Sequence, residues 1–274
     1  MRPALKPIGV RWTIGDVSLE GFEALQFSVW GVWNLFADAA DYVVCVNSVP
    51  LSIAQEQAGA LPDEVCWQAV TEADAPAFLR NHLDTAMAEG VAWKFAPLRI
   101  FPDRHELSLD NDCILWALPG SMWEWLASED LCILAEDVKT CLGQYAGMCG
   151  PEPRNSGIRG LPPGFDLAAA LETMFLQMPV KLQSELDEQG LQVAALSRCR
   201  RTLAVPIEDV TICSPFPPHL PRLGKCGVHF VGLNARELPW TFCGRGASEL
   251  TRENWNGFKT DISQRVGITQ AINR

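Results

Sequence analysis

The first ninety residues alternate between strand-like and helix-like hydrophobic patterns, and this alternation restricts the folds open to the chain. Short continuous apolar runs are typical of strands covered on both faces, whereas apolar residues three and four positions apart are typical of amphipathic helices. The patterns predict strands at 8–14, 42–46 and 65–70, and helices at 21–36 and 75–88. This order favours an α/β fold, in which a mostly parallel sheet is flanked by helices and ligands bind at the carboxyl ends of the strands.

The remainder of the chain continues this pattern with less regular spacing. Further strands are predicted at 98–101, at 106–109 with a continuation at 113–116, at 131–135 and at 227–233. Helices are predicted at 166–178, with Asp166 as candidate N-cap, and at 182–196. Glycine and proline make 157–164 a loop by composition and 215–221 irregular. Because there is no internal repeat, we expect a single domain over 1–246 and a C-terminal segment over 247–274.

Charge and composition exclude several classes of function. The chain has 22 Lys and Arg against 33 Asp and Glu, a net charge of −11, and this charge disfavours nucleic acid as a partner. No apolar run is long and uninterrupted enough to predict a membrane span, and no signal peptide is expected at the start. The ten cysteines contain no Cys-x-x-Cys pair, and several lie within apolar runs, so we expect reduced, buried thiols in a cytoplasmic protein.

The segment 106–115 carries the strongest candidates for chemistry. Residues two apart on extended backbone point to the same side, so Asp110 and Asp112 can direct two carboxylates to one point at the end of a strand. Two converging carboxylates repel each other unless a cation lies between them, and hard oxygen ligands suit Mg²⁺ or Mn²⁺. Asp-Asn-Asp is also common in turns, but its position between two apolar half-strands favours a metal site.

Two further polar residues interrupt apolar segments. His229 lies in the apolar run 227–231, where a histidine is more often a hydrogen-bonded core residue than a ligand, although its imidazole can complete a metal site. Lys94 lies within 91–97, and a buried lysine needs a partner such as a phosphate or the Asp110 carboxylate. Trp123, Trp125 and Trp240 lie near predicted loops, where an indole can stack on a sugar or a base.

Four short motifs occur in an order that resembles a known family. They are Asp110-Asn-Asp112, Asn155-Ser-Gly157, Asp187-Glu-Gln189, and His229-Phe-Val-Gly232 followed by Pro239-Trp240. This order is similar to that of the family-eight retaining glycosyltransferases, the glycogenin type, which have the GT-A fold of nucleotide-diphospho-sugar transferases. The motifs are individually short, but together they span most of the chain.

The resemblance implies a set of roles for these residues. It implies a nucleotide-diphosphate sugar as donor, an unidentified acceptor, and Mn²⁺ or Mg²⁺ held by Asp110, Asp112 and His229. Asp110 would be shared between the metal and the ribose, and Gln189 or Glu188 would lie beside the anomeric carbon. The remaining donor contacts implied are Thr13, Asp16, Lys94, Asn155 and Arg236. For Thr13 and Asp16, the end of a strand followed by a helix cap explains the same residues equally well.

The chain departs from the family pattern at two positions. Leu238 precedes Pro239-Trp240 where the family has a lysine that contacts the diphosphate, and Arg236 is the cation available in a longer spacer. The family's asparagine after the acidic-Gln motif is absent from 191–193. Three functions therefore remain open: a glycosyltransferase that transfers sugar with retention, a protein of this fold that binds nucleotide or sugar without turnover, and a nucleotidyltransferase or sugar-nucleotide hydrolase with the same metal site.

Overall fold

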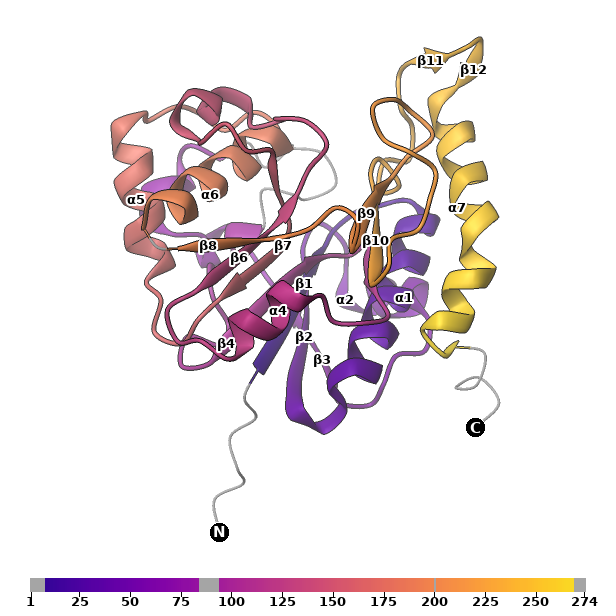
Figure 1. Cartoon of the computed structure of the whole chain (residues 1–274), viewed down its shortest axis with the longest axis horizontal. Coiled ribbons are helices and arrows are strands. Elements are labelled where there is room, and N and C mark those ends of the chain that lie inside the picture. The colour runs from indigo at the N-terminus through magenta and orange to yellow at the C-terminus, as the bar shows by residue number, and fades with distance from the viewer. Residues whose placement is uncertain (1–7, 84–93, 200, 269–274) are drawn as a thin grey trace.

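A computed structural model describes residues 8–83, 94–199 and 201–268, and a seven-stranded mixed sheet lies at its centre (Figure 1). The strand order is β3-β2-β1-β4-β7-β6-β8. The strands are β1 (Ile8–Ile14), β2 (Ala40–Val46), β3 (Val65–Ala69), β4 (His105–Asp110), β6 (Cys132–Glu136), β7 (Arg154–Leu161) and β8 (Thr202–Val205). All neighbouring pairs are parallel except those that β7 makes with β4 and β6. The predicted mixed, mostly parallel sheet is confirmed.

Helices cover both faces of this sheet. They are α1 (Leu19–Phe36), α2 (Leu51–Ala58), α3 (Ala77–Arg80), α4 (Gly120–Leu126), α5 (Leu167–Gln177), α6 (Glu185–Cys199) and α7 (Ala247–Arg265). Alternate residues of β6 belong to two cores. Ile133 is part of the core that also contains side chains of α1, α2 and α4, whereas Leu134 is part of the core with α5 and α6. Helix α1 begins where the Ser18 hydroxyl accepts a hydrogen bond from the Gly21 amide.

A second sheet carries the histidine of the candidate site. It has the order β5-β10-β9, formed by β5 (Cys113–Leu115), β10 (Gly227–Phe230) and β9 (Val210–Cys213). The strand predicted at 106–109 with a continuation at 113–116 is therefore two strands in two different sheets, and the chain crosses between them at Asp110–Asp112. Because β5 pairs with β10, Cys113 lies opposite His229.

The C-terminal helix α7 packs along α1 (Figure 1). Phe27 of α1 contacts the buried Trp255 of α7, and the Trp255 indole donates a hydrogen bond to the Glu23 carboxylate at 2.6 Å. A short hairpin, β11 (Thr241–Phe242) and β12 (Arg245–Gly246), precedes this helix. None of the helices in the part of the chain that the structure describes is long and apolar enough to cross a membrane.

The predicted loop at 157–164 is wrong over 157–161, which form the second half of β7. The glycines that suggested a loop are instead required by close packing. A Cβ atom on Gly160 would lie 2.5 Å from Ile133 Cγ1 and 2.8 Å from Trp125 Cε2, and one on Gly157 would lie 2.4 Å from His229 Cε1.

Two other sequence predictions differ from the structure. Residues 98–101 form no strand, because the backbone amides of Ile100 and Phe101 donate to the Glu106 carboxylate instead of to a neighbouring strand. The helix predicted at 75–88 is formed only over Ala77–Arg80 and gives way to a turn, and 84–93 lie outside the described residues.

The cysteine and tryptophan predictions are met in part. The nine cysteines whose side chains are described form no disulfide, and Cys45, Cys113, Cys132 and Cys213 are buried as expected, whereas Cys66 and Cys243 are exposed. Trp123 and Trp240 are exposed. Trp125 is fully buried in the core, which excludes it from stacking on a ligand.

Replacing Gly160 by alanine should lower the free energy of unfolding by about 1–3 kcal/mol, because the added methyl group overlaps Ile133 and Trp125. Urea denaturation measures this change. Gly257→Ala is the matched control, because Gly257 lies on the exposed face of α7 with open space around it, and alanine there should stabilise by about 0.5–1 kcal/mol. Equal effects of the two substitutions would contradict the packing explanation.

Candidate active site

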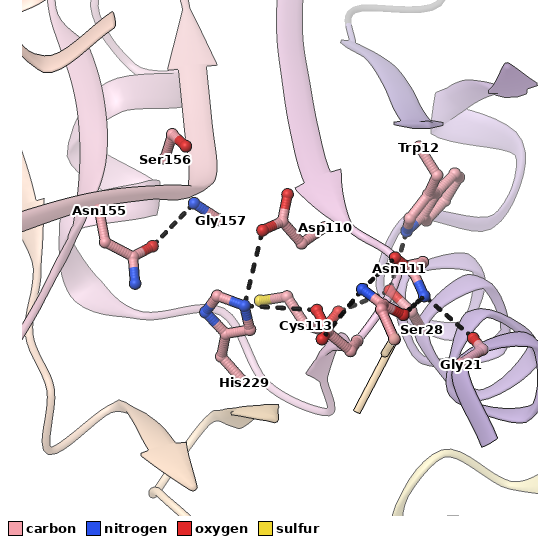
Figure 2. A network of polar contacts seen from close by, with 12 residues as sticks. Trp12, Gly21, Ser28, Asp110, Asn111, Cys113, Asn155, Ser156, Gly157 and His229 are labelled. Carbon is pink, nitrogen blue, oxygen red and sulfur yellow. Dashed lines mark hydrogen bonds and ion pairs between the residues drawn. The ribbon is translucent and has the colours of Figure 1, made fainter. Parts of the chain in front are cut away.

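Asp110, Asp112 and His229 meet at the carboxyl end of β4 (Figure 2). His229 Nε2 lies 3.6 Å from Asp110 Oδ2 and 3.3 Å from Asp112 Oδ1. One ligand atom from each of the three side chains lies within 4.8 Å of the others. The three residues that the sequence proposed as metal ligands are thus brought together, although they come from distant segments.

The backbone of both sheets fixes this geometry. Asp110 is the last residue of β4, and the turn through Asn111 reverses into β5. The Phe230 amide donates a hydrogen bond to the Asp112 carbonyl at 3.0 Å, which holds the start of β5 beside β10. Gly157 of β7 packs directly against the His229 ring, so that the absence of a side chain there leaves room for the imidazole.

The donor atoms of the three side chains fit a divalent cation. Asp112 Oδ1 is buried and accepts no hydrogen bond of good geometry, although a buried carboxylate oxygen ordinarily has such a partner. Two carboxylates and one imidazole are ligands that Mn²⁺ accepts readily, and carboxylates also suit Mg²⁺. The site therefore offers an unsatisfied buried oxygen at the position where a metal ligand is expected.

Lys94 supplies a positive charge on the other side of Asp110. Its Nζ lies 2.5 Å from Asp110 Oδ1 and 3.7 Å from Glu188 Oε2. Burial disfavours the charge on Lys94, but the Asp110 and Glu188 carboxylates outweigh it and raise the lysine pKa. Burial likewise disfavours ionisation of Asp110, yet Lys94 and His229 hold its pKa below the ordinary value.

The pKa values of Asp112 and His229 are both raised, in contrast to that of Asp110. Burial raises the pKa of Asp112, and the nearby Asp110 charge adds to the effect. Burial disfavours a charged His229, but its close contact with Asp112 and the charge of Asp110 raise the imidazole pKa above its ordinary value. A metal cation bound between Asp110, Asp112 and His229 would add to the positive charge of Lys94 and relieve the repulsion between the two carboxylates.

Glu188 lies beneath this site in a buried polar layer. Its Oε1 accepts a hydrogen bond from the Gln192 amide, whose oxygen accepts one from the Arg159 guanidinium. Burial raises the pKa of Glu188 to about 7, against the opposing effect of Lys94. Burial also lowers the pKa of Arg159 to about 10, with a further contribution from the neighbouring Arg11 charge.

Hydrogen bonds fix the side chains of Gln189 and Asn155. The Gln189 side-chain oxygen accepts from the Ser156 amide at 3.1 Å, and its amide donates to the Cys141 carbonyl at 2.7 Å. The Asn155 side-chain oxygen accepts from the Gly157 amide at 2.7 Å (Figure 2). Both side chains are therefore held in one orientation, Asn155 beside His229 and Gln189 against the neighbouring Ser156 amide.

The remaining predicted donor contacts lie at the end of β1 and in the loop after β10. Thr13 of β1 is the register partner of Asp110, and its hydroxyl accepts a hydrogen bond from Arg11 at 3.1 Å. Asp16 and Arg236 form an ion pair between the end of β1 and the loop after β10, and both side chains are largely exposed. The structure thus places these two residues together.

Sequence reasoning missed an amide pair that positions Asp112. Asn111 and Asn234 donate to each other's side-chain oxygens at 2.6 and 3.0 Å, and Asn234 also donates to Asp112 Oδ2 at 3.3 Å. Asn111 further donates to the Gly21 carbonyl of α1 (Figure 2). The only sequence signal for Asn234 is its place five residues after His229.

Comparisons with known proteins establish the fold. No model of a known protein family matches the chain, and no curated protein matches its sequence. An active-site mutant of LgtC has a TM-score of 0.54 at 12% identity, and the galactosyltransferase LgtC in complex with donor and acceptor sugar analogues has a TM-score of 0.52 at 13% identity. Each alignment covers 91% of this chain and 95% of LgtC.

A third solved structure agrees. The bifunctional glycosyltransferase WbbM, in its apo form, has a TM-score of 0.55 at 15% identity, covering 97% of this chain and 53% of WbbM. At these identities the likeness concerns the fold alone, which is the GT-A fold predicted from the sequence.

Replacing Lys94 by methionine should lower the free energy of unfolding by about 3–5 kcal/mol in metal-free buffer at pH 8, because Asp110 and Glu188 then remain buried without their counter-charge. When folding raises the pKa of a carboxyl group, the free energy of unfolding of the protein falls as the pH rises from the unfolded-state pKa to the folded-state pKa. The deficit should therefore shrink at pH 5, below the Glu188 pKa of about 7. Denaturant titrations at both pH values measure it.

The control for this substitution is Lys139→Met, at an exposed lysine, which should change stability by no more than about 0.5 kcal/mol. A deficit of the same size at pH 5 and pH 8 would contradict the charge argument for Lys94.

Proposed function

We propose that this chain is a metal-dependent glycosyltransferase, related to family eight, that transfers a sugar from a nucleotide-diphosphate donor to an acceptor with retention at the anomeric carbon. One observation carries the proposal: Asp110, Asp112 and His229 converge at the carboxyl end of β4 within a GT-A fold. Ligands of open α/β sheets bind at such strand ends. LgtC and WbbM, whose folds are similar, are glycosyltransferases.

The three side chains would hold Mn²⁺ or Mg²⁺. A bound divalent cation supplies Lewis-acid stabilisation of the negative charge that develops on a departing diphosphate. Lys94 neutralises Asp110 from the opposite side and Asn234 orients Asp112, so that both carboxylates keep their direction in the absence of donor. Thr13 would contact the nucleotide, since it is the register partner of Asp110, and the Asp16–Arg236 ion pair just beyond the end of β1 would extend this contact.

Gln189, Glu188 and Asn155 would surround the transferred sugar. The two hydrogen bonds of Gln189 hold its side chain in one orientation, which is the condition for positioning a sugar carbon near an attacking hydroxyl. Glu188 accepts from Gln192 and lies 3.7 Å from Lys94, so that its carboxylate is fixed as well. We assign Asn155 to the donor sugar because it lies beside His229.

Leu238 is the observation that favours a second function, nucleotide-sugar binding without turnover. Its backbone amide donates to the Ser248 hydroxyl at 2.6 Å, and its side chain supplies no charge for a diphosphate. Product analysis with UDP-sugars and Mn²⁺ separates the possibilities: transfer to an acceptor supports the glycosyltransferase, free sugar indicates a hydrolase, and binding without product indicates the second function.

The absence of disulfides among the nine described cysteines is the basis for proposing a reducing, cytoplasmic location.

Replacing Asp112 by asparagine should abolish Mn²⁺-dependent binding of UDP and UDP-sugars while the protein stays folded, because the change removes one ligand and also removes one of two repelling carboxylates. Isothermal titration calorimetry with and without Mn²⁺ measures the loss. Asp63→Asn, at an exposed aspartate before β3, is the matched control and should bind as the wild type does. Undiminished Mn²⁺-UDP binding by the Asp112 variant would show that the ligand assignment is wrong.

A further inference from the structure

Two buried arginine side chains lie near each other on the face of the sheet that carries Asp110. Arg11 of β1 and Arg159 of β7 are both register partners of Ser108 of β4, so the three side chains point to the same face. Arg11 is 0% exposed and Arg159 is 1% exposed. Since neighbouring strands are about 4.8 Å apart, the two arginine Cα atoms are about 10 Å apart, and each side chain can reach the other.

The hydrogen bonds of the two guanidinium groups bring them to one short segment. Arg11 Nη1 donates to the Pro97 carbonyl, and Arg159 Nη2 donates a long hydrogen bond of 3.5 Å to the carbonyl of the next residue, Leu98. Because the two acceptors belong to consecutive residues, the two positive charges are neighbours. Arginine remains protonated in proteins at neutral pH, so the two groups repel each other.

Neither arginine has a charged partner within the described residues. There, no carboxylate forms an ion pair with Arg11 or Arg159, and the Nε atom of each is buried without a hydrogen-bond acceptor. The thiol of Cys45 lies near Arg11, but burial raises the pKa of this thiol against the effect of the Arg11 charge, and the thiol stays neutral. A buried charge without a counter-charge is costly, so the pair needs a negative partner.

The buried charges around the two arginines do not balance. Lys94 and Asp110 form an ion pair and neutralise each other. The other buried charged groups of this layer are three arginines and two glutamates, namely Arg11, Arg99, Arg159, Glu106 and Glu188. One positive charge is therefore in excess when both glutamates are ionised. Glu106 and Glu188 also have other partners, at 3.9 Å from Arg99 Nε and 3.7 Å from Lys94 Nζ.

Ser108 leaves space for a small ligand between the two arginines. Its side chain is short, and it is partly exposed although β4 lies in the middle of the sheet. Asp110, two residues further along the same face, has a side chain that is 19% exposed. Solvent therefore reaches Ser108 from the side of Asp110, and a small ion can enter by the same route.

We propose that Arg11 and Arg159 bind one monovalent inorganic anion of the size of chloride, next to Ser108. A single negative charge matches the excess of the layer, and the ion can accept hydrogen bonds from both Nε–H groups. A water molecule accepts the same hydrogen bonds but carries no charge, so it leaves the repulsion between the arginines in place. Phosphate and other large anions do not fit between two side chains that are almost completely buried.

The anion would hold helix α6 on the sheet. Arg159 donates to the Gln192 side chain of α6, and Gln192 donates to Glu188 on the same helix. By screening the Arg11 charge, the anion would keep Arg159 in this position. The inference concerns the stability of the fold and does not depend on the proposed function.

Thermal unfolding of the full chain tests the stabilising effect, at fixed pH and ionic strength, with sodium gluconate exchanged for sodium chloride. Gluconate is too large to enter between the two arginines. The melting temperature of the wild type should rise by about 2–4 °C for each tenfold increase in chloride above the dissociation constant. Arg11→Met and Arg159→Met should lose this rise, whereas Arg222→Met, at an exposed arginine, should keep it.

Anomalous diffraction from wild-type crystals grown in sodium bromide locates the ion without any variant. Data recorded near the bromine absorption edge should show a peak in contact with the guanidinium groups of Arg11 and Arg159. Bromide peaks only at other positions, or an ordered water without anomalous signal between the two arginines, would overturn the proposal. A chloride-dependent rise in melting temperature of equal size in Arg159→Met and Arg222→Met would overturn it as well.

Discussion

The repulsion between Asp110 and Asp112 is the constraint on which the surrounding structure depends. Two carboxylates directed at one imidazole in a buried place cost free energy unless neighbouring groups compensate them. Lys94 compensates Asp110, and Asn234 donates to the oxygen of Asp112 that faces away from His229. The other Asp112 oxygen has the His229 imidazole at 3.3 Å and no hydrogen bond of good geometry, and a bound cation would satisfy it.

A similar need for compensation recurs on part of one face of the sheet. The opposite face is apolar and packs against α1 and α4, whereas this face carries the buried charges of Arg11, Glu106 and Arg159. Glu106 accepts from two backbone amides of the segment that precedes β4, and Arg159 reaches Gln192 of α6. The covering segments supply the polar partners of these charges, and elsewhere on the same face Leu134 and Leu161 pack against the apolar side chains of α5 and α6.

The parts of the structure that depend on local pattern could be predicted from the sequence, and the parts that depend on distant partners could not. Apolar runs predicted β1 and β2, and the position of Asp110 and Asp112 between two half-strands pointed to a site. The glycines of β7 were misread as a loop because the reason for Gly157 is the His229 ring. Asn234 was missed because its partner, Asp112, lies far away in the sequence.

The most direct measurement of the central claim is anomalous diffraction from crystals grown with Mn²⁺ and UDP, recorded near the manganese absorption edge. The account predicts one strong anomalous peak about 2.0–2.2 Å from an oxygen of Asp110, an oxygen of Asp112 and Nε2 of His229, since the three atoms already lie within 4.8 Å of one another. A peak at other residues, or an ordered UDP with no peak among these three side chains, would contradict it.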